Sequence, residues 1–193
     1  MRKKYKGFYM DKNNYIVRIN KIKEAMAEKD IDVFLIGPSS NLFYLTGYGM
    51  EGDERLLLLV LPREGGSGAS SANSGAFVLA NLLYKEQVKS LPVNDFVYWK
   101  DGEDPFALLK SEIEKRKIKL SRAALEPKIP SLFSLPISRL FPGAEFELGT
   151  QLTDPLRQFK DESELELIRR ACRKSDEALA AVIDRGSYWI GKT

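Results

Sequence analysis

The residues with the most specific hydrogen-bonding chemistry lie in one short stretch, residues 41–55. An Asn side chain both donates and accepts, a Tyr carries a polar tip on an apolar ring, and an Arg pairs with carboxylates. Such groups can form a substrate entrance or a subunit interface, or they can simply fix the turn between a helix and a strand. The candidates are Asn41, Tyr44, Thr46, Gly47 and Arg55. For Arg55, the partner could be Asp53, another subunit or a substrate carboxylate.

The amino-acid composition excludes most hydrolytic mechanisms. The chain has no histidine and one cysteine, which excludes Ser-His-Asp and Cys-His catalysis and every histidine-containing metal site. We expect Cys172 to be a small buried hydrophobe, because it falls on the apolar stripe of a predicted helix. The acidic clusters lie at helix starts or in hydrophilic turns, where carboxylates are expected for structural reasons. We therefore expect no catalytic residue and no metal ligand in this chain.

Two glycine patterns match nucleotide-binding spacings but lack the required context. Residues 186–193 have the spacing of a phosphate-binding loop, yet a predicted helix precedes them where a strand is needed. Residues 47–52 match the dinucleotide fingerprint, but a strand follows where a helix must begin. Neither pattern predicts a nucleotide site.

The charge and hydropathy of the sequence argue against two further kinds of partner, nucleic acid and membranes. The 30 basic and 27 acidic residues are dispersed, so nucleic acid is not expected. No stretch reaches the length of a membrane span, and the basic cluster at residues 2–6 is not followed by the apolar run of a signal peptide. A single cysteine suits a reducing compartment, and we expect a cytoplasmic protein.

The elements that must position the candidate residues alternate between strands and helices. The predicted strands are 31–36, 55–61, 76–80, 95–99, 122–126 and 145–148. The predicted helices are 14–29, a short helix that Ser39 or Ser40 caps and that runs through Tyr44, 82–89, 105–118, 131–140 and 161–184. This order predicts an α/β fold with a mixed sheet of about six strands flanked by helices, followed by a long C-terminal helix.

Three regions are expected along the chain. Residues 1–13 form a basic, disordered start, residues 14–157 form the α/β domain, and residues 158–193 form a junction helix with an atypical tail. The glycine- and serine-rich residues 65–75 are interpreted as a long mobile hairpin loop within the domain.

Four segments together resemble a known family. They are a helix containing Arg18-Ile-Asn-Lys-Ile-Lys-Glu-Ala-Met with the strand after it, the motif Asn41-Leu-Phe-Tyr44-Leu-Thr46-Gly47, the apolar strand from Arg55, and Leu156-Arg157-Gln-Phe-Lys160-Asp161-Glu162-Ser-Glu164 with the helix that continues from it. The chain resembles the N-terminal domain of the creatinase/prolidase family, the pita-bread metallopeptidases that include Xaa-Pro dipeptidase and aminopeptidase P. The resemblance covers roughly residues 14–184.

The resemblance implies a non-catalytic domain. Family members place two divalent metal ions in a C-terminal domain, and they use the N-terminal domain for dimer contacts and to shape the substrate entrance. The implied partners are a second copy or the catalytic domain, and the implied parent substrates are short peptides with proline second. An inactive protein-interaction module and the N-terminal domain of a creatinase-type amidinohydrolase stay open as alternatives. Residues 185–193 depart from the family pattern, so we expect a fragment or a truncated gene.

Overall fold

The computed structural model describes residues 12–49, 52–64 and 75–190, so most of the predicted basic start and of the 65–75 loop lie outside the described residues. The strands are β1 (Val33–Ile36), β2 (Leu58–Pro62), β3 (Phe77–Asn81), β4 (Phe96–Trp99), β5 (Arg122–Leu125) and β6 (Glu145–Leu148). The helices are α1 (Lys12–Glu28), α2 (Ser40–Thr46), the 3-10 turn η1 (Leu82–Tyr84), α3 (Lys85–Val88), α4 (Pro105–Lys115), α5 (Ser131–Leu140), α6 (Thr150–Gln158) and α7 (Glu162–Ile190).

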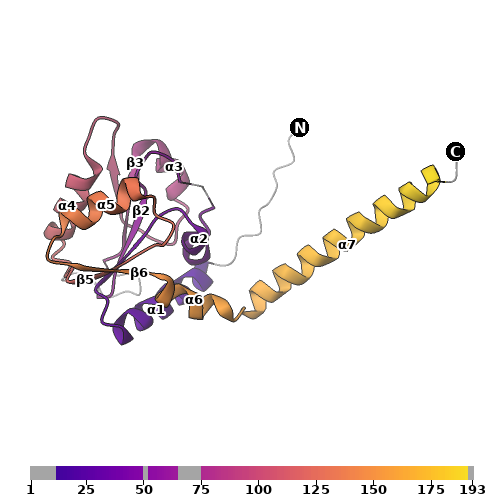
Figure 1. The fold of residues 1–193 in the computed structure, drawn as a ribbon, viewed down its shortest axis with the longest axis horizontal. Helices are drawn as coiled ribbons and strands as arrows, with labels where there is room; N and C mark the ends of the chain where they lie inside the picture. The colour runs from indigo at the N-terminus through magenta and orange to yellow at the C-terminus, as the bar shows by residue number, and fades with distance from the viewer. Residues whose placement is uncertain (1–11, 50–51, 65–74, 191–193) are drawn as a thin grey trace. The chain divides into compact units, whose positions relative to one another are not determined.

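The six strands form one mixed sheet in the order β4-β3-β2-β1-β5-β6 (Figure 1). β2 runs antiparallel to both β1 and β3, whereas β1 pairs with β5 in parallel. β3 and β4 are parallel, as are β5 and β6. The predicted mixed six-stranded sheet and the antiparallel β2–β3 pair are confirmed.

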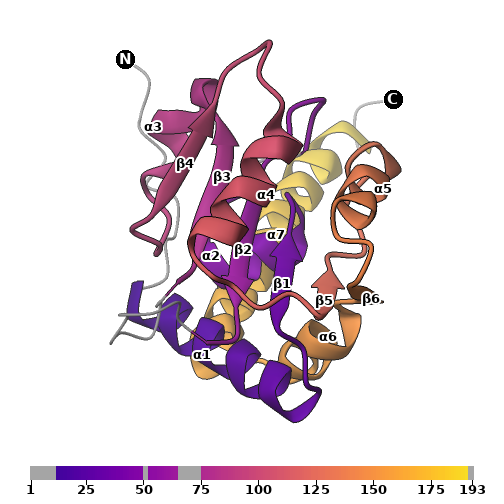
Figure 2. The same ribbon diagram turned by 90° about the vertical axis from the view of Figure 1, so that its left-hand side faces the viewer.

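Both faces of the sheet are apolar, which explains the continuous hydrophobic runs in the sequence. Successive residues of β1 alternate between two buried clusters, because side chains along a strand point to opposite faces. One cluster joins the sheet to α1, α2, α3 and α6; the other joins it to α4 and α5, and Figure 2 shows α4 and α5 on the near side of the sheet.

The structure differs from the sequence prediction at β2, α6 and α7, among other elements. β2 begins at Leu58 and not at Arg55, since its ladder with β1 starts at Leu59 and its ladder with β3 starts at Leu58. α6 was not predicted, since Pro155 and several polar residues obscure its pattern. α7 continues to Ile190, so residues 186–190 are helical and do not form a phosphate-binding loop.

The chain divides into two compact units, Met1–Leu156 and Arg157–Thr193; the three-region division made from the sequence stays a prediction. In the second unit, the predicted capping box at the start of α7 is present. The Asp161 amide donates to Glu164 Oε2 at 3.1 Å, and the Glu164 amide donates to Asp161 Oδ1 at 2.9 Å. Cys172 is exposed, so its expected burial is wrong. Across the described residues, none of the helices combines the length and apolarity that a membrane span requires.

Candidate functional site

The helix that carries the motif, α2, is closed at both ends. Ser39 is its N-cap, with the side-chain oxygen accepting from the Leu42 amide at 3.1 Å. Gly47 ends it in the left-handed region at φ 76° and donates its amide to the Phe43 carbonyl at 2.7 Å. A Cβ at Gly47 would lie 2.6 Å from Tyr15 Oη, so both the backbone angle and α1 require glycine here.

Asn41 and Thr46 make internal contacts. Asn41 is buried and donates through Nδ2 to Glu126 Oε2 at 3.0 Å, just beyond the end of β5. Thr46 Oγ1 donates to the Leu42 carbonyl at 2.6 Å and accepts from the Tyr48 amide at 3.2 Å. These two residues therefore hold α2 against the sheet and shape the chain that leaves it.

Tyr44 joins α1, α2 and α6. The Arg18 guanidinium lies 4.0 Å from the centre of the Tyr44 ring and donates to the Tyr44 carbonyl at 2.9 Å. The Tyr44 hydroxyl donates to the Leu156 carbonyl at 3.5 Å. The half-buried ring thus connects the motif to the last residue of the first unit.

Arg55 lies in a polar network at the other side of the motif. Its Nε and Nη2 donate to the two carboxylate oxygens of Asp101, both at 3.1 Å, and Nη1 pairs with Glu54. The hydrogen bond to Asp101 is the main cause that raises the pKa of Arg55, and the same contact lowers the pKa of Asp101. Asn81 Nδ2 also donates to Asp101, at 2.9 Å. The guanidinium is therefore committed to carboxylates of its own domain.

Asp53 faces Arg55 through the backbone and not through the guanidinium. It accepts from the Arg55 amide at 2.8 Å and from the Tyr84 hydroxyl. Burial and then the contact with Asp53 raise the pKa of Tyr84 to about 12. Burial and the charge of Asp53 likewise raise the pKa of Tyr48 to about 12. Of the pairings considered for Arg55 in the sequence, an Asp53 side-chain pair is not formed.

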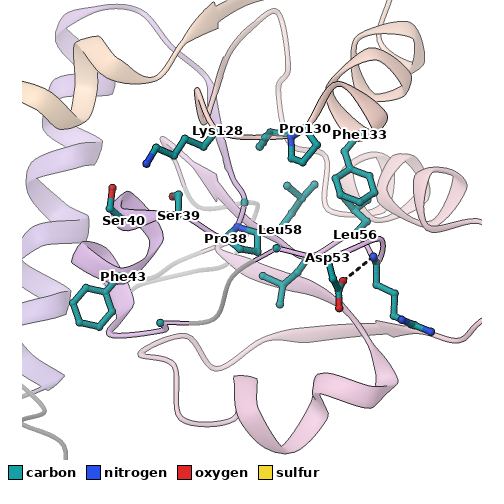
Figure 3. Close-up of a pocket in the computed structure, with 16 residues that line it drawn as sticks. Pro38, Ser39, Ser40, Phe43, Asp53, Leu56, Leu58, Lys128, Pro130 and Phe133 are labelled. Carbon is teal, nitrogen blue, oxygen red and sulfur yellow. Dashed lines mark hydrogen bonds between the residues drawn. The ribbon is translucent and has the colours of Figure 1, made fainter.

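A cavity of about 630 Å³ opens between these groups, at the carboxyl ends of β1 and β5 (Figure 3). This is where α/β sheets commonly bind ligands, and the volume suits a small molecule. Arg55 lines the cavity, whereas Asn41, Tyr44, Thr46 and Gly47 are not among its lining residues. The candidates thus separate into four that hold α2 in place and one that faces a cavity.

Sequence reasoning missed Glu126, Asp101 and Lys128. Glu126 is buried and could have been noticed as a charge placed at the end of an apolar strand. Asp101 was assigned to a hydrophilic turn, and Lys128 had no local signal that set it apart from other surface lysines. No group of three or more His, Cys, Asp or Glu side chains in the described residues could hold a metal ion. The donor sets of a dinuclear metal centre therefore do not fit the described part of this chain.

The chain matches known proteins along most of its length. Residues 18–159 match the creatinase/prolidase N-terminal domain model. The probable dipeptidase PepE of Mycobacterium tuberculosis is 30% identical over 173 residues, which is 89% of this chain and 44% of the relative. The chain thus spans less than half the length of that curated relative.

Solved structures agree on the fold. A recombinant prolidase from Thermococcus sibiricus superposes with a TM-score of 0.77 and 25% identity, covering 91% of this chain and 45% of the other. The N-terminal domain of a Xaa-Pro dipeptidase from Lactobacillus brevis covers 69% of this chain and 95% of that domain, with a TM-score of 0.59 and 20% identity. Because the family model covers residues 18–159, well over half of the sequence, the chain belongs to the creatinase/prolidase N-terminal domain family.

Proposed function

We propose that the chain serves as the non-catalytic N-terminal domain of a Xaa-Pro dipeptidase- or aminopeptidase-like metallohydrolase. In that parent protein it contributes to dimerisation and shapes the entrance for short peptides with proline second. The observation that carries the proposal is the match of residues 18–159 to the N-terminal domain model, together with the 44% coverage of the curated relative. Metal chemistry belongs to the parent, and no step of it passes through the described residues.

The site geometry supports an entrance role more directly for Arg55 than for the other candidates. Arg55 lines the open cavity, and its side chain is 26% exposed while Asp101 holds the guanidinium. A side chain that is already fixed shapes the wall of an entrance without a large entropic cost when a peptide passes. A cytoplasmic setting is part of the proposal and is supported by the single cysteine.

A domain replacement tests the proposal. Residues 12–158 of this chain would replace the corresponding domain of a related Xaa-Pro dipeptidase, and dimerisation and the kinetics of Xaa-Pro cleavage would be measured. We expect a dimeric, active hybrid, whereas the 193-residue chain alone should cleave no Xaa-Pro dipeptide in the presence of manganese, cobalt or zinc. Cleavage by the chain alone would overturn the assignment as non-catalytic. A hybrid no more dimeric or active than the bare catalytic domain would overturn the structural role.

Arg55→Gln in the hybrid separates entrance shaping from folding. We expect KM to change more than kcat, because the residue meets peptides before the reacting atoms are in place. Arg139→Gln removes the same charge from an exposed position of α5 outside the cavity and should leave both constants unchanged. Equal KM and kcat values in the two variants would argue against a role for Arg55 at the substrate entrance.

The alternative of an inactive interaction module also has an observation in its favour. α7 exposes a set of large apolar side chains to solvent, and such a face is suited to a protein partner. A stable complex of this chain with an unrelated protein, combined with failure of the domain replacement, would favour the module. An active dimeric hybrid would favour the peptidase domain.

A further inference from the structure

The cavity beside α2 is lined mainly by apolar side chains. Its walls come from the connection after β1, the residues that lead into β2, and the connection between β5 and α5. Figure 3 shows Pro38, Leu58, Pro130 and Phe133 around it. Such walls favour a ligand with an apolar body, since burial of that surface supplies most of the binding free energy.

Three charged side chains line this cavity, and two of them already have partners within the chain. Arg55 is paired with Asp101 and Glu54. Asp53 accepts hydrogen bonds from the Tyr84 hydroxyl and the Arg55 amide. A ligand would have to break these contacts to use either group, which would cancel much of the gain from a new ion pair.

Lys128 is different. It lines the cavity and is exposed, and within residues 12–49, 52–64 and 75–190 its ammonium group has no carboxylate or hydrogen-bond partner. In Figure 3 it extends along the same end of the cavity as Ser39 and Ser40, while Asp53 lies toward the opposite end. The cavity therefore combines an apolar interior with one unneutralised positive charge at one end.

From this combination we propose that the cavity binds a small apolar carboxylate, with the carboxylate on the Lys128 ammonium and the apolar body against Pro38, Pro130 and Phe133. The volume of about 630 Å³ accommodates a ligand the size of an amino acid or a dipeptide. The C-terminal end of a short peptide and a free apolar amino acid share this chemistry. This site goes beyond the proposed role in a parent enzyme, because it is complete within this chain.

The test is a binding titration of the full 193-residue chain, followed by methyl NMR. The probes are Leu-Pro, its C-terminal amide and free L-leucine. We expect Leu-Pro to shift the methyl signals of Leu56, Leu58 and Ile129 with a dissociation constant in the millimolar range, and we expect the amide not to do so. L-leucine distinguishes the two sources of the carboxylate: binding as tight as that of Leu-Pro assigns the site to free amino acids, and weaker binding assigns it to peptides.

Two lysine substitutions complete the design. Lys128→Gln should weaken Leu-Pro binding by about tenfold, the loss expected for one charged hydrogen bond. Lys110→Gln removes the same charge from an exposed position of α4 outside the cavity and should not change binding. Lys128→Arg should retain binding. The proposal is overturned if no probe shifts these methyl signals, if the amide binds as well as the acid, or if the two glutamine variants behave alike.

The same titration distinguishes this site from the proposed peptidase role. Failure of all the probes to bind the isolated chain removes the cavity site and leaves the domain-replacement result untouched. An inactive hybrid removes the peptidase role and leaves a carboxylate-binding cavity in place. The two conclusions therefore stand or fall on separate measurements.

Discussion

The Asn41 amide donates a 3.0 Å hydrogen bond to the carboxylate of Glu126, and both side chains are buried although 85 residues separate them in the sequence. Glu126 also donates its backbone amide to the Leu35 carbonyl at 2.9 Å, which continues the pairing of β1 with β5. The contact thus attaches α2 to the carboxyl end of the central parallel pair. α2 contributes Ser40 and Phe43 to the cavity wall, so this internal hydrogen bond also determines the position of that wall.

Asn41→Asp is expected to lower the free energy of unfolding by at least about 2 kcal/mol at neutral pH, because it places a carboxylate against the buried Glu126. Asn94→Asp makes the same chemical change at an exposed position and should have little effect. Urea unfolding of both variants measures the difference. Equal stabilities would mean that the Asn41–Glu126 contact is not maintained in solution.

Gly47→Ala should destabilise the chain by more than about 1 kcal/mol, since it combines a left-handed backbone with a contact to Tyr15. Gly102 provides the matched control. It also has a positive φ, 94°, but a Cβ there meets no atom within 4 Å. The loss at Gly47 should therefore exceed the loss at Gly102 in thermal or urea unfolding, and the excess measures the Tyr15 contact. A smaller loss at Gly47 would contradict the packing of α1 on α2.

Asp32 should make the free energy of unfolding decrease at acidic pH. Burial opposes its ionisation, but hydrogen bonds from the Arg122 and Ser121 amides and the contact with Lys119 outweigh burial and lower its pKa. A lowered folded-state pKa contributes stability that is fully present above the unfolded value and is lost as the pH falls through the folded value. Asp32→Asn should cost about 2 kcal/mol at neutral pH and less in strong acid.

Asp176→Asn, at an exposed position of α7, is the control for Asp32→Asn and should leave the pH profile unchanged. The test compares the free energy of unfolding of both variants with that of the wild type, from neutral pH down to below the usual pKa range of aspartate. A constant cost for Asp32→Asn across that range would show that its ionisation is not coupled to folding.

Tyrosine titration tests the network around Asp53. With pKa values of about 12, Tyr48 and Tyr84 should ionise at a higher pH than ordinary tyrosines. Because the unfolded chain releases these protons first, the fold should lose stability as the pH rises above the usual tyrosine range. Asp53→Asn should lower the pKa of Tyr84 more than that of Tyr48, because Tyr84 also loses a charged hydrogen-bond acceptor. Ultraviolet absorption of the phenolates, assigned with Tyr48→Phe and Tyr84→Phe, provides the measurement. An unchanged pKa of Tyr84 in the Asp53→Asn variant would show that Asp53 does not interact with Tyr84.

The sheet could be predicted from the sequence because a continuous apolar run of strand length is a local signal. β1, β2 and β3 are apolar on both faces, and Ser39 and Gly47 mark the two ends of α2 by their residue types. α6 escaped prediction for the opposite reason. Its proline and polar residues weaken the local signal, and the packing of Leu152 on the core supplies what the local sequence lacks.

The partners of the candidate residues could not be predicted, because they depend on contacts between distant segments. Asp101 lies 46 residues from Arg55, and no local pattern links the two. The chemistry of Asn41 and Arg55 requires polar partners, but the fold decides which partners they meet. A cavity lined by three separate connections, with Lys128 at one end, likewise exists only after the sheet has formed.

The last prediction concerns α7, whose Leu179, Val182 and Ile183 side chains are 60%, 66% and 60% exposed. These positions recur at helical spacing, so they form one apolar face that gains free energy when it is covered. We expect the isolated chain to self-associate with increasing concentration through this face. Val182→Lys should shift sedimentation toward the monomer, whereas Ala181→Lys adds the same charge on the opposite side of the helix and should not. A wild-type chain that stays monomeric at high concentration, or two variants that behave alike, would show that this face does not drive association.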